Sequence, residues 1–183
     1  PAGATRETHS RRQKLARDLC GGDGNGTAQT HDDLGRAEAT DPKALSLLDT
    51  NVLIYAFEPE SGFHRWGRET VAGAVAGEGA AINAVSLAEI CVGEADPGTV
   101  ADRVRSWGIE ILDVPVAAAE TSAKAYQRYL SRRRGYVKEA SPTMPLPDFF
   151  IGAHAEIMGW KLATADQGRF KTYFPSVVLE TPS

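Results

Sequence analysis

The sequence predicts an α/β fold built on a parallel sheet, and two features lead to that prediction. From Leu45 onward, short apolar runs alternate with longer stretches of helical periodicity, the pattern of repeated strand–helix units. The 183 residues are 42% hydrophobic, which is enough for one domain with a sizeable core but short for two. We therefore expect one globular domain over residues 45–183, preceded by a tail.

Residues 1–44 differ in composition from the rest of the chain. They contain no Phe, Trp or Tyr, they include the turn-forming run GGDGNGT at 21–27, and their acidic and basic charges cancel. We expect this segment to be a disordered N-terminal extension. Because no methionine precedes Met144, we also expect it to be translated from upstream of the true start, which N-terminal sequencing would test.

The first half of the domain predicts three strands and the helices between them. Hydrophobic periodicity assigns each element its type, and Gly, Pro, Asn and Asp mark the boundaries. The expected elements are a strand at 45–49, a short helix from about 51, a helix at 64–76, a strand at 80–83, helices at 86–94 and 99–107, and a strand at 109–112.

The second half predicts two longer helices and two strands. Pro115 opens and Gly135 closes a helix over 116–134, matching the usual proline-early, glycine-late asymmetry of helix ends. After a proline-containing loop at 141–147, Pro147 opens a helix that runs to Met158. Strands at 161–165 and 176–179 complete the expected sheet.

Charge and cysteine content limit the classes of function. A formal net charge of −4 argues against broad electrostatic adhesion to nucleic acid, but it is compatible with an acidic active site that attracts phosphate once a metal is bound. The two cysteines, Cys20 and Cys91, suggest a reducing compartment rather than a disulfide framework. No stretch is long and apolar enough for a signal peptide or a membrane span, so we expect a cytoplasmic protein with no membrane partner.

Four acids stand at equivalent ends of the predicted strand–helix units. Asp49 and Asp166 each follow an apolar strand, Asp148 follows Pro147 in the first turn of a helix, and Glu89 lies in a helix after the second strand. Sites in parallel sheets lie at the carboxyl ends of the strands, and clustered carboxylates are usually held ionised by a divalent cation. Thr164, two residues before Asp166 on the same side of the strand, is placed to orient a carboxylate or a water.

Each of three acids also has a structural explanation. Glu89 completes an S-x-x-E capping box with Ser86, Asp148 could stabilise the start of its helix, and Asp166 could be a turn or cap residue. By sequence alone these roles remain open, and Asp49 is the acid with the weakest structural alternative. His154, six residues after Asp148, falls on another helix face and is expected to be a packed or partner-facing residue.

Four segments resemble the successive motifs of PIN-domain nucleases, most closely the VapC-type toxins of bacterial toxin–antitoxin systems. They are LLDTNVLIYAF at 47–57, INAVSLAEICVG at 82–93, PDFFIGAHA at 147–155 and LATADQGRFKTYFP at 162–175. The resemblance implies a three-layer α/β/α sandwich with a central parallel sheet. It also implies an acidic pocket for Mg²⁺, with Mn²⁺ as a substitute, formed by Asp49, Glu89, Asp148 and Asp166 and supported by Asn51 and Thr164. Ala165 departs from the pattern, because relatives often carry a basic residue there; only a local substrate contact is affected.

The function this resemblance implies is that of a metal-dependent endoribonuclease toxin, homodimeric and neutralised by a cognate antitoxin. Alternatives are a PIN-fold RNA-processing nuclease without an antitoxin, a catalytically silent binding module, and a phosphatase that uses Asp49 as nucleophile. The last is weakened because position 51 is Asn, where such enzymes generally carry a second aspartate. A small DNA-binding-type gene next to this one would favour the toxin.

We expect basic residues of the helix over 116–134 to contact the RNA. Arg128, Arg132, Arg133 and Arg134 are interleaved with tyrosines, a combination that suits a nucleic-acid backbone and unpaired bases. The alternative is a solvated helix end, where the helix dipole favours Lys and Arg.

Overall fold

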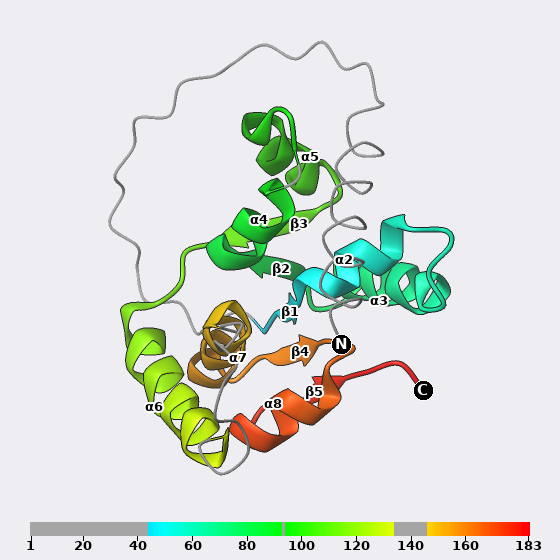
Figure 1. The fold of residues 1–183 in the computed structure, drawn as a ribbon. Coiled ribbons are helices and arrows are strands. Elements are labelled where there is room, and N and C mark those ends of the chain that lie inside the picture. The colour runs from blue at the N-terminus through cyan, green and yellow to red at the C-terminus, as the bar shows by residue number, and fades with distance from the viewer. Residues whose placement is uncertain (1–43, 93, 134–145) are drawn as a thin grey trace.

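Five parallel strands form one sheet in the computed structural model, which describes residues 44–92, 94–133 and 146–183. The strand order is β3-β2-β1-β4-β5, with β1 in the centre (Figure 1). The chain therefore builds the sheet outward from β1 in one direction and then in the other, so the strand order reverses between β1 and β4. The strands are β1 (Ser46–Leu48), β2 (Ala80–Asn83), β3 (Ile109–Leu112), β4 (Lys161–Ala163) and β5 (Leu179–Glu180).

Helices cover both faces of this sheet. Successive strand residues point to opposite faces, so an apolar strand presents apolar side chains on both. Leu48 belongs to an apolar cluster with residues of α2 to α5, whereas Leu47 belongs to a second cluster with residues of α6, α7 and α8. The predicted three-layer α/β/α sandwich is confirmed (Figure 1). The helices are α2 (Thr50–Phe57), α3 (His64–Ala76), α4 (Ala84–Cys91), the 3₁₀ turn η1 (Pro97–Thr99), α5 (Val100–Ser106), α6 (Val116–Arg133), α7 (Leu146–Met158) and α8 (Gln167–Tyr173).

No helix within the described ranges is both long and apolar enough to cross a membrane.

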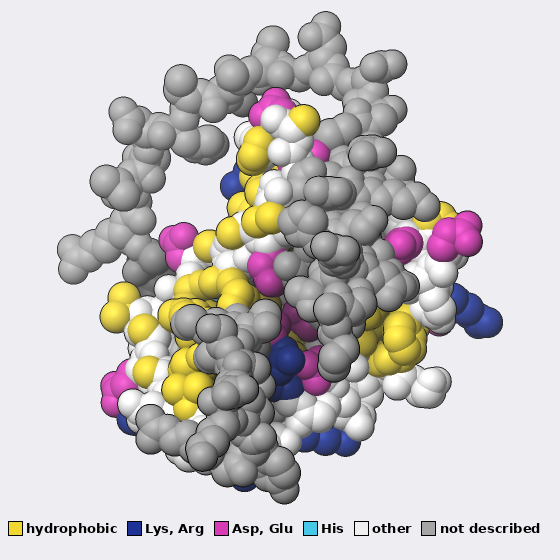
Figure 2. Space-filling view, viewed as in Figure 1, with side chains coloured by type: hydrophobic (Ala, Val, Ile, Leu, Met, Phe, Trp, Pro, Cys, Tyr) yellow, Lys and Arg dark blue, Asp and Glu magenta, His cyan; other side chains and the backbone are white. Residues whose placement is uncertain are grey.

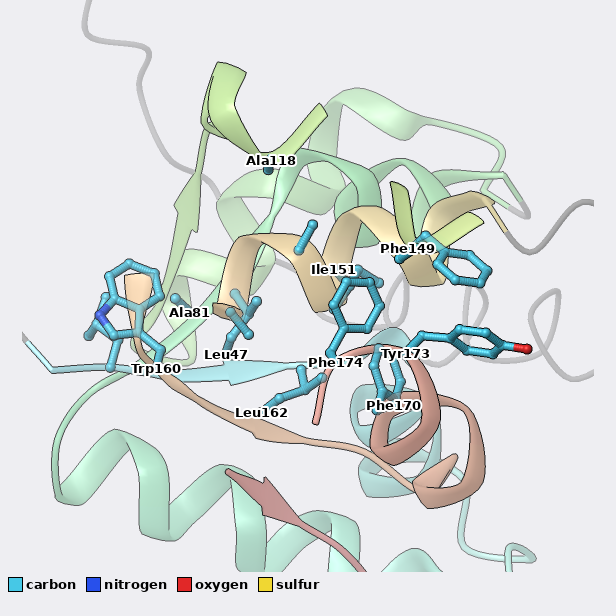
Figure 3. Packing of buried hydrophobic residues seen from close by; sticks show 14 residues of the cluster. Leu47, Ala81, Ala118, Phe149, Ile151, Trp160, Leu162, Phe170, Tyr173 and Phe174 are labelled. Carbon is cyan, nitrogen blue, oxygen red and sulfur yellow. The ribbon is translucent and has the colours of Figure 1, made fainter. Parts of the chain in front are cut away.

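Aromatic side chains fix α8 against α7 (Figure 3). The ring of Phe149 lies 5.3 Å from that of Tyr173 and 5.9 Å from that of Phe174, measured between centroids. Gly152 permits this approach, since a Cβ there would lie 2.4 Å from the Phe174 ring. This packing sets the first turn of α7, which contains Phe149, against the C-terminal end of α8.

Most predicted elements are found within one or two residues of their expected positions, with three exceptions. The helix predicted at 86–94 is Ala84–Cys91, so it ends three residues earlier. The helix α8 was not predicted. The last strand was predicted at 176–179 but is Leu179–Glu180, because Val177 N–H instead donates to the carbonyl of Phe174 in the turn that ends α8. The expected closure at Gly135 and most of the loop 141–147 lie outside the described residues.

Candidate active site at the carboxyl edge of the sheet

Asp49 lies at the carboxyl end of β1, where the strand order reverses. Its side chain is only 1% exposed. It occupies the N-cap position of α2, yet it makes no capping hydrogen bond. Instead its Oδ2 accepts hydrogen bonds from Thr164 Oγ1 at 2.8 Å and from Asn51 Nδ2 at 3.4 Å. The carboxylate thus bonds across the sheet edge to Thr164, which follows β4, and also to Asn51 in the first turn of α2.

Thr164 joins Asp49 to Asp166. Its hydroxyl donates to Asp49 and accepts from the backbone N–H of Asp166 at 3.0 Å. Asp166 in turn is the N-cap of α8, since its Oδ1 accepts from the backbone N–H of Arg169 at 3.1 Å. The capping role considered for Asp166 is therefore present, but it uses one oxygen and leaves Oδ2 facing the site.

Arg169 bridges two of the four acids, Asp166 and Asp148. Its Nη1 lies 3.2 Å from Asp166 Oδ2 and also pairs with Oδ2 of Asp148, in the first turn of α7. Figure 2 shows acidic and basic side chains next to each other near the middle of the face viewed in Figure 1. Arg169 was not singled out from the sequence, because the helix that carries it was not predicted.

Glu89 faces the site from α4. Its Oε2 accepts from Thr50 Oγ1 at 2.6 Å, which ties it to the residue after Asp49. The capping box with Ser86 is wrong: the N-cap of α4 is Asn83, whose Oδ1 accepts from the backbone N–H groups of Val85 and Ser86.

The electrostatics of Asp49 reflect burial and negative neighbours. Desolvation is the largest effect and raises the pKa of Asp49 from its usual 3.8 to about 6; the hydrogen bond from Thr164 opposes the rise, and the nearby charges of Glu89 and Asp166 add to it. A carboxyl group that is destabilised by other carboxylates lies in a negative potential. Such a potential attracts a cation.

The donor chemistry of this edge fits a hard divalent cation. The donors on Asp49, Glu89, Asp148 and Asp166 are all carboxylate oxygens, the ligands that Mg²⁺ and Mn²⁺ prefer. As placed, however, no three or more His, Cys, Asp or Glu side chains of the described residues converge closely enough to hold a metal ion. The guanidinium of Arg169 lies between two of the four acids, so the donor set fits a metal only if that side chain moves aside.

Comparison with known proteins assigns the family. The family model for the PIN domain matches residues 46–174. The chain belongs to the PIN domain family. Comparison with curated protein sequences finds no match.

Solved structures share the fold of this PIN domain. A chain of VapBC2 from Rickettsia felis, bound to a DNA fragment from its promoter, is 19% identical, with a TM-score of 0.52 over 76% of this chain and 99% of that one. A chain of DNA-bound VapBC from Salmonella typhimurium is 22% identical, with a TM-score of 0.51 over 75% and 98%. FitAcB from Neisseria gonorrhoeae gives the same identity, TM-score and coverage. At these identities the likeness concerns the fold.

Two of the predicted RNA-contact residues of the PIN domain serve its own packing. Arg128 donates from Nη2 to the carbonyl oxygen of Tyr173 at 2.7 Å. The guanidinium of Arg132 lies 5.5 Å from the centre of the Tyr173 ring, and Arg132 is otherwise exposed. Arg133 ends α6, and Arg134 lies outside the described residues. Arg128 and Arg132 are both exposed, so both remain accessible to a substrate.

His154 and a groove on α3 lie apart from the acids. His154 is 1% exposed, packs on Trp160 and has its pKa lowered by burial, so it is a core residue. A groove of about 470 Å³ is lined by side chains of α2, α3 and Trp107, and none of the four acids lines it. This groove and the acidic edge are thus separate features of the described residues.

Proposed function

We propose that this PIN domain is a Mg²⁺-dependent endoribonuclease that acts as the toxin of a toxin–antitoxin pair. The observation that carries the proposal is Asp49: a buried carboxylate at the point where the strand order reverses, hydrogen-bonded by Thr164 and unused as a helix cap. Ligands of α/β sheets bind at such points. Membership of the PIN family makes phosphodiester hydrolysis the chemistry to test first.

We assign metal-binding and orienting roles to the following residues of this chain. Asp49, Glu89, Asp148 and Asp166 would hold the cation. When bound, Mg²⁺ supplies charge neutralisation at the phosphate and makes a water more acidic. The Thr164 hydroxyl fixes the direction of Asp49 Oδ2, and the Thr50 hydroxyl fixes Glu89 Oε2. Asp49 must lose its proton before both its oxygens can serve as ligands, a step that its pKa of about 6 permits at neutral pH.

RNA is the proposed substrate, and a cognate antitoxin and a second copy of the chain are the proposed protein partners. Arg132 at the exposed end of α6 would contact the RNA backbone. The antitoxin is supported by the fold relatives, two of which are VapBC proteins in complex with DNA. Co-expression with the product of an adjacent small gene tests this partner: it should co-purify with the PIN domain and suppress cleavage.

Nuclease assays on purified protein test the activity. The wild type should cut single-stranded RNA, and not DNA of the same sequence, in Mg²⁺ but not in EDTA. Asp49→Asn and Asp166→Asn should each lose more than the roughly 10- to 100-fold that altering an outer-shell metal partner removes.

The matched control is Asp113→Asn. Asp113 also follows a strand, β3, but it is exposed and lies two strands away from β1. This variant should retain activity. Cleavage that survives both Asp49→Asn and Asp166→Asn, or that also disappears in the Asp113 variant, would contradict the proposal.

A further inference from the structure

Arg169 occupies the place of a cation between two carboxylates of the acidic edge. One guanidinium nitrogen, Nη1, contacts both Asp148 and Asp166. The side chain of Arg169 is 32% exposed, that of Asp148 20% and that of Asp166 36%. The ion pairs are therefore partly shielded from water but open to exchange.

We propose that Arg169 is a built-in competitor for the divalent cation: its guanidinium neutralises Asp148 and Asp166 until the metal ion displaces it. The inference rests on the proposed metal site. It explains why the four acids at this edge of the sheet do not all converge as placed: Asp148 and Asp166 meet at Arg169 Nη1, whereas Asp49 and Glu89 accept hydrogen bonds from Thr164 and Thr50.

The backbone around Arg169 allows such an exchange without refolding. The cap between Asp166 Oδ1 and the Arg169 backbone N–H holds the start of α8. Phe170 and Tyr173 pack this helix into the core cluster that contains Phe149 of α7 (Figure 3). Asp148 and Arg169 thus sit on helices that are packed together, and only the long Arg169 side chain has to leave.

Charge favours the exchange once the metal arrives. Asp49 already lies in the negative field of Glu89 and Asp166, so the edge carries more negative charge than one guanidinium neutralises. A divalent ion that contacts all four acids neutralises more of this charge than Arg169 does. Without the metal, Arg169 prevents Asp148 and Asp166 from repelling each other.

The test is Mn²⁺ binding, measured by calorimetry or by the electron paramagnetic resonance signal of the free ion. Arg169→Gln should bind Mn²⁺ on the order of 3- to 10-fold more tightly than the wild type, because each partly exposed ion pair that must be broken contributes only modestly. Arg169→Lys keeps the charge and should remain close to the wild type. Lys171→Gln removes one positive charge from an exposed site on the same helix, so it measures the non-specific effect of charge.

A second readout is thermal unfolding. In EDTA, Arg169→Gln should unfold at a lower temperature than the wild type, and saturating Mn²⁺ should shrink that difference. Equal or weaker Mn²⁺ binding by Arg169→Gln, or tightening no greater than that of Lys171→Gln, overturns the inference while leaving the metal site intact. If the wild type binds no Mn²⁺, the inference and the proposed function fail together.

Discussion

Replacing Asp49 by Asn should stabilise the metal-free protein, and the gain should depend on pH. The folded protein holds the Asp49 proton more tightly than the unfolded chain does, because the pKa is about 6 in the fold and 3.8 ordinarily. Such a group lowers the free energy of unfolding as pH rises from about 4 to about 6, and the loss then stays constant at higher pH. Asparagine has no charge to bury, so the variant avoids this loss.

The size of the effect follows from the two pKa values. A difference of about two units corresponds to about 3 kcal/mol at pH 8, where Asp49 is ionised in both states. At pH 4.5 the loss is about 1 kcal/mol, because the folded protein keeps the proton there. The stability of Asp49→Asn relative to the wild type should therefore rise by about 2 kcal/mol between these two pH values. The pH dependence of the Thr164 hydrogen bond in the wild type is already contained in the pKa of Asp49, and the asparagine of the variant does not titrate.

Urea denaturation in EDTA at both pH values measures this change, with Asp113→Asn as the exposed control. Saturating Mg²⁺ at pH 8 should then reverse the order of stability, since an ion that binds only the folded state stabilises the wild type and the variant lacks a ligand for it. A relative stability that stays the same at the two pH values would refute the reasoning that burial and negative neighbours destabilise the Asp49 charge.

Three further substitutions test the packing and the hydrogen bonds that position the site. Gly152→Ala would place a Cβ 2.4 Å from the Phe174 ring and should lower the free energy of unfolding by about 1–3 kcal/mol in urea titrations, whereas Gly73→Ala, in α3 with open space around it, should raise it slightly. Asn83→Ala removes both capping bonds of α4 and should lower the same quantity by about 1–2 kcal/mol. Thr164→Val should reduce RNA cleavage roughly 10- to 100-fold, while Thr164→Ser should keep most of it; equal activities would show that the hydroxyl is dispensable.

The sheet and the long helices could be predicted from the sequence because their apolar periodicity is strong. Leu47 and Leu48 alternate between the two cores, and α3, α6 and α7 follow their predicted ranges closely. The helix α8 could not be predicted in the same way. It has seven residues, it includes Gly168, and an isolated helix of that length is not stable. The buried Phe170 and Tyr173 stabilise it through tertiary contacts.

Local sequence patterns were also insufficient for part of the site. The four acids could be selected from their places at strand ends and helix starts, and Thr164 and Asn51, which bond to Asp49, were selected with them. The partners Thr50 and Arg169 were not. The S-x-x-E pattern indicated Ser86 as a helix cap, whereas Asn83, three residues earlier, takes that role. Local patterns alone do not decide between adjacent capping residues; the decision comes from where the strand β2 ends.

The partners divide the acidic edge into two halves with different electrostatics. Asp49 and Glu89 accept hydrogen bonds from the neutral hydroxyls of Thr164 and Thr50, and a hydroxyl orients a carboxylate without cancelling its charge. Asp148 and Asp166 are held by a guanidinium, which orients them and also neutralises them. An arriving cation therefore meets, at Asp49, a carboxylate that is oriented by a hydroxyl and not by a guanidinium. Binding should begin there and continue to Asp148 and Asp166 as Arg169 is displaced, so Asp49→Asn should weaken Mn²⁺ binding even in an Arg169→Gln background.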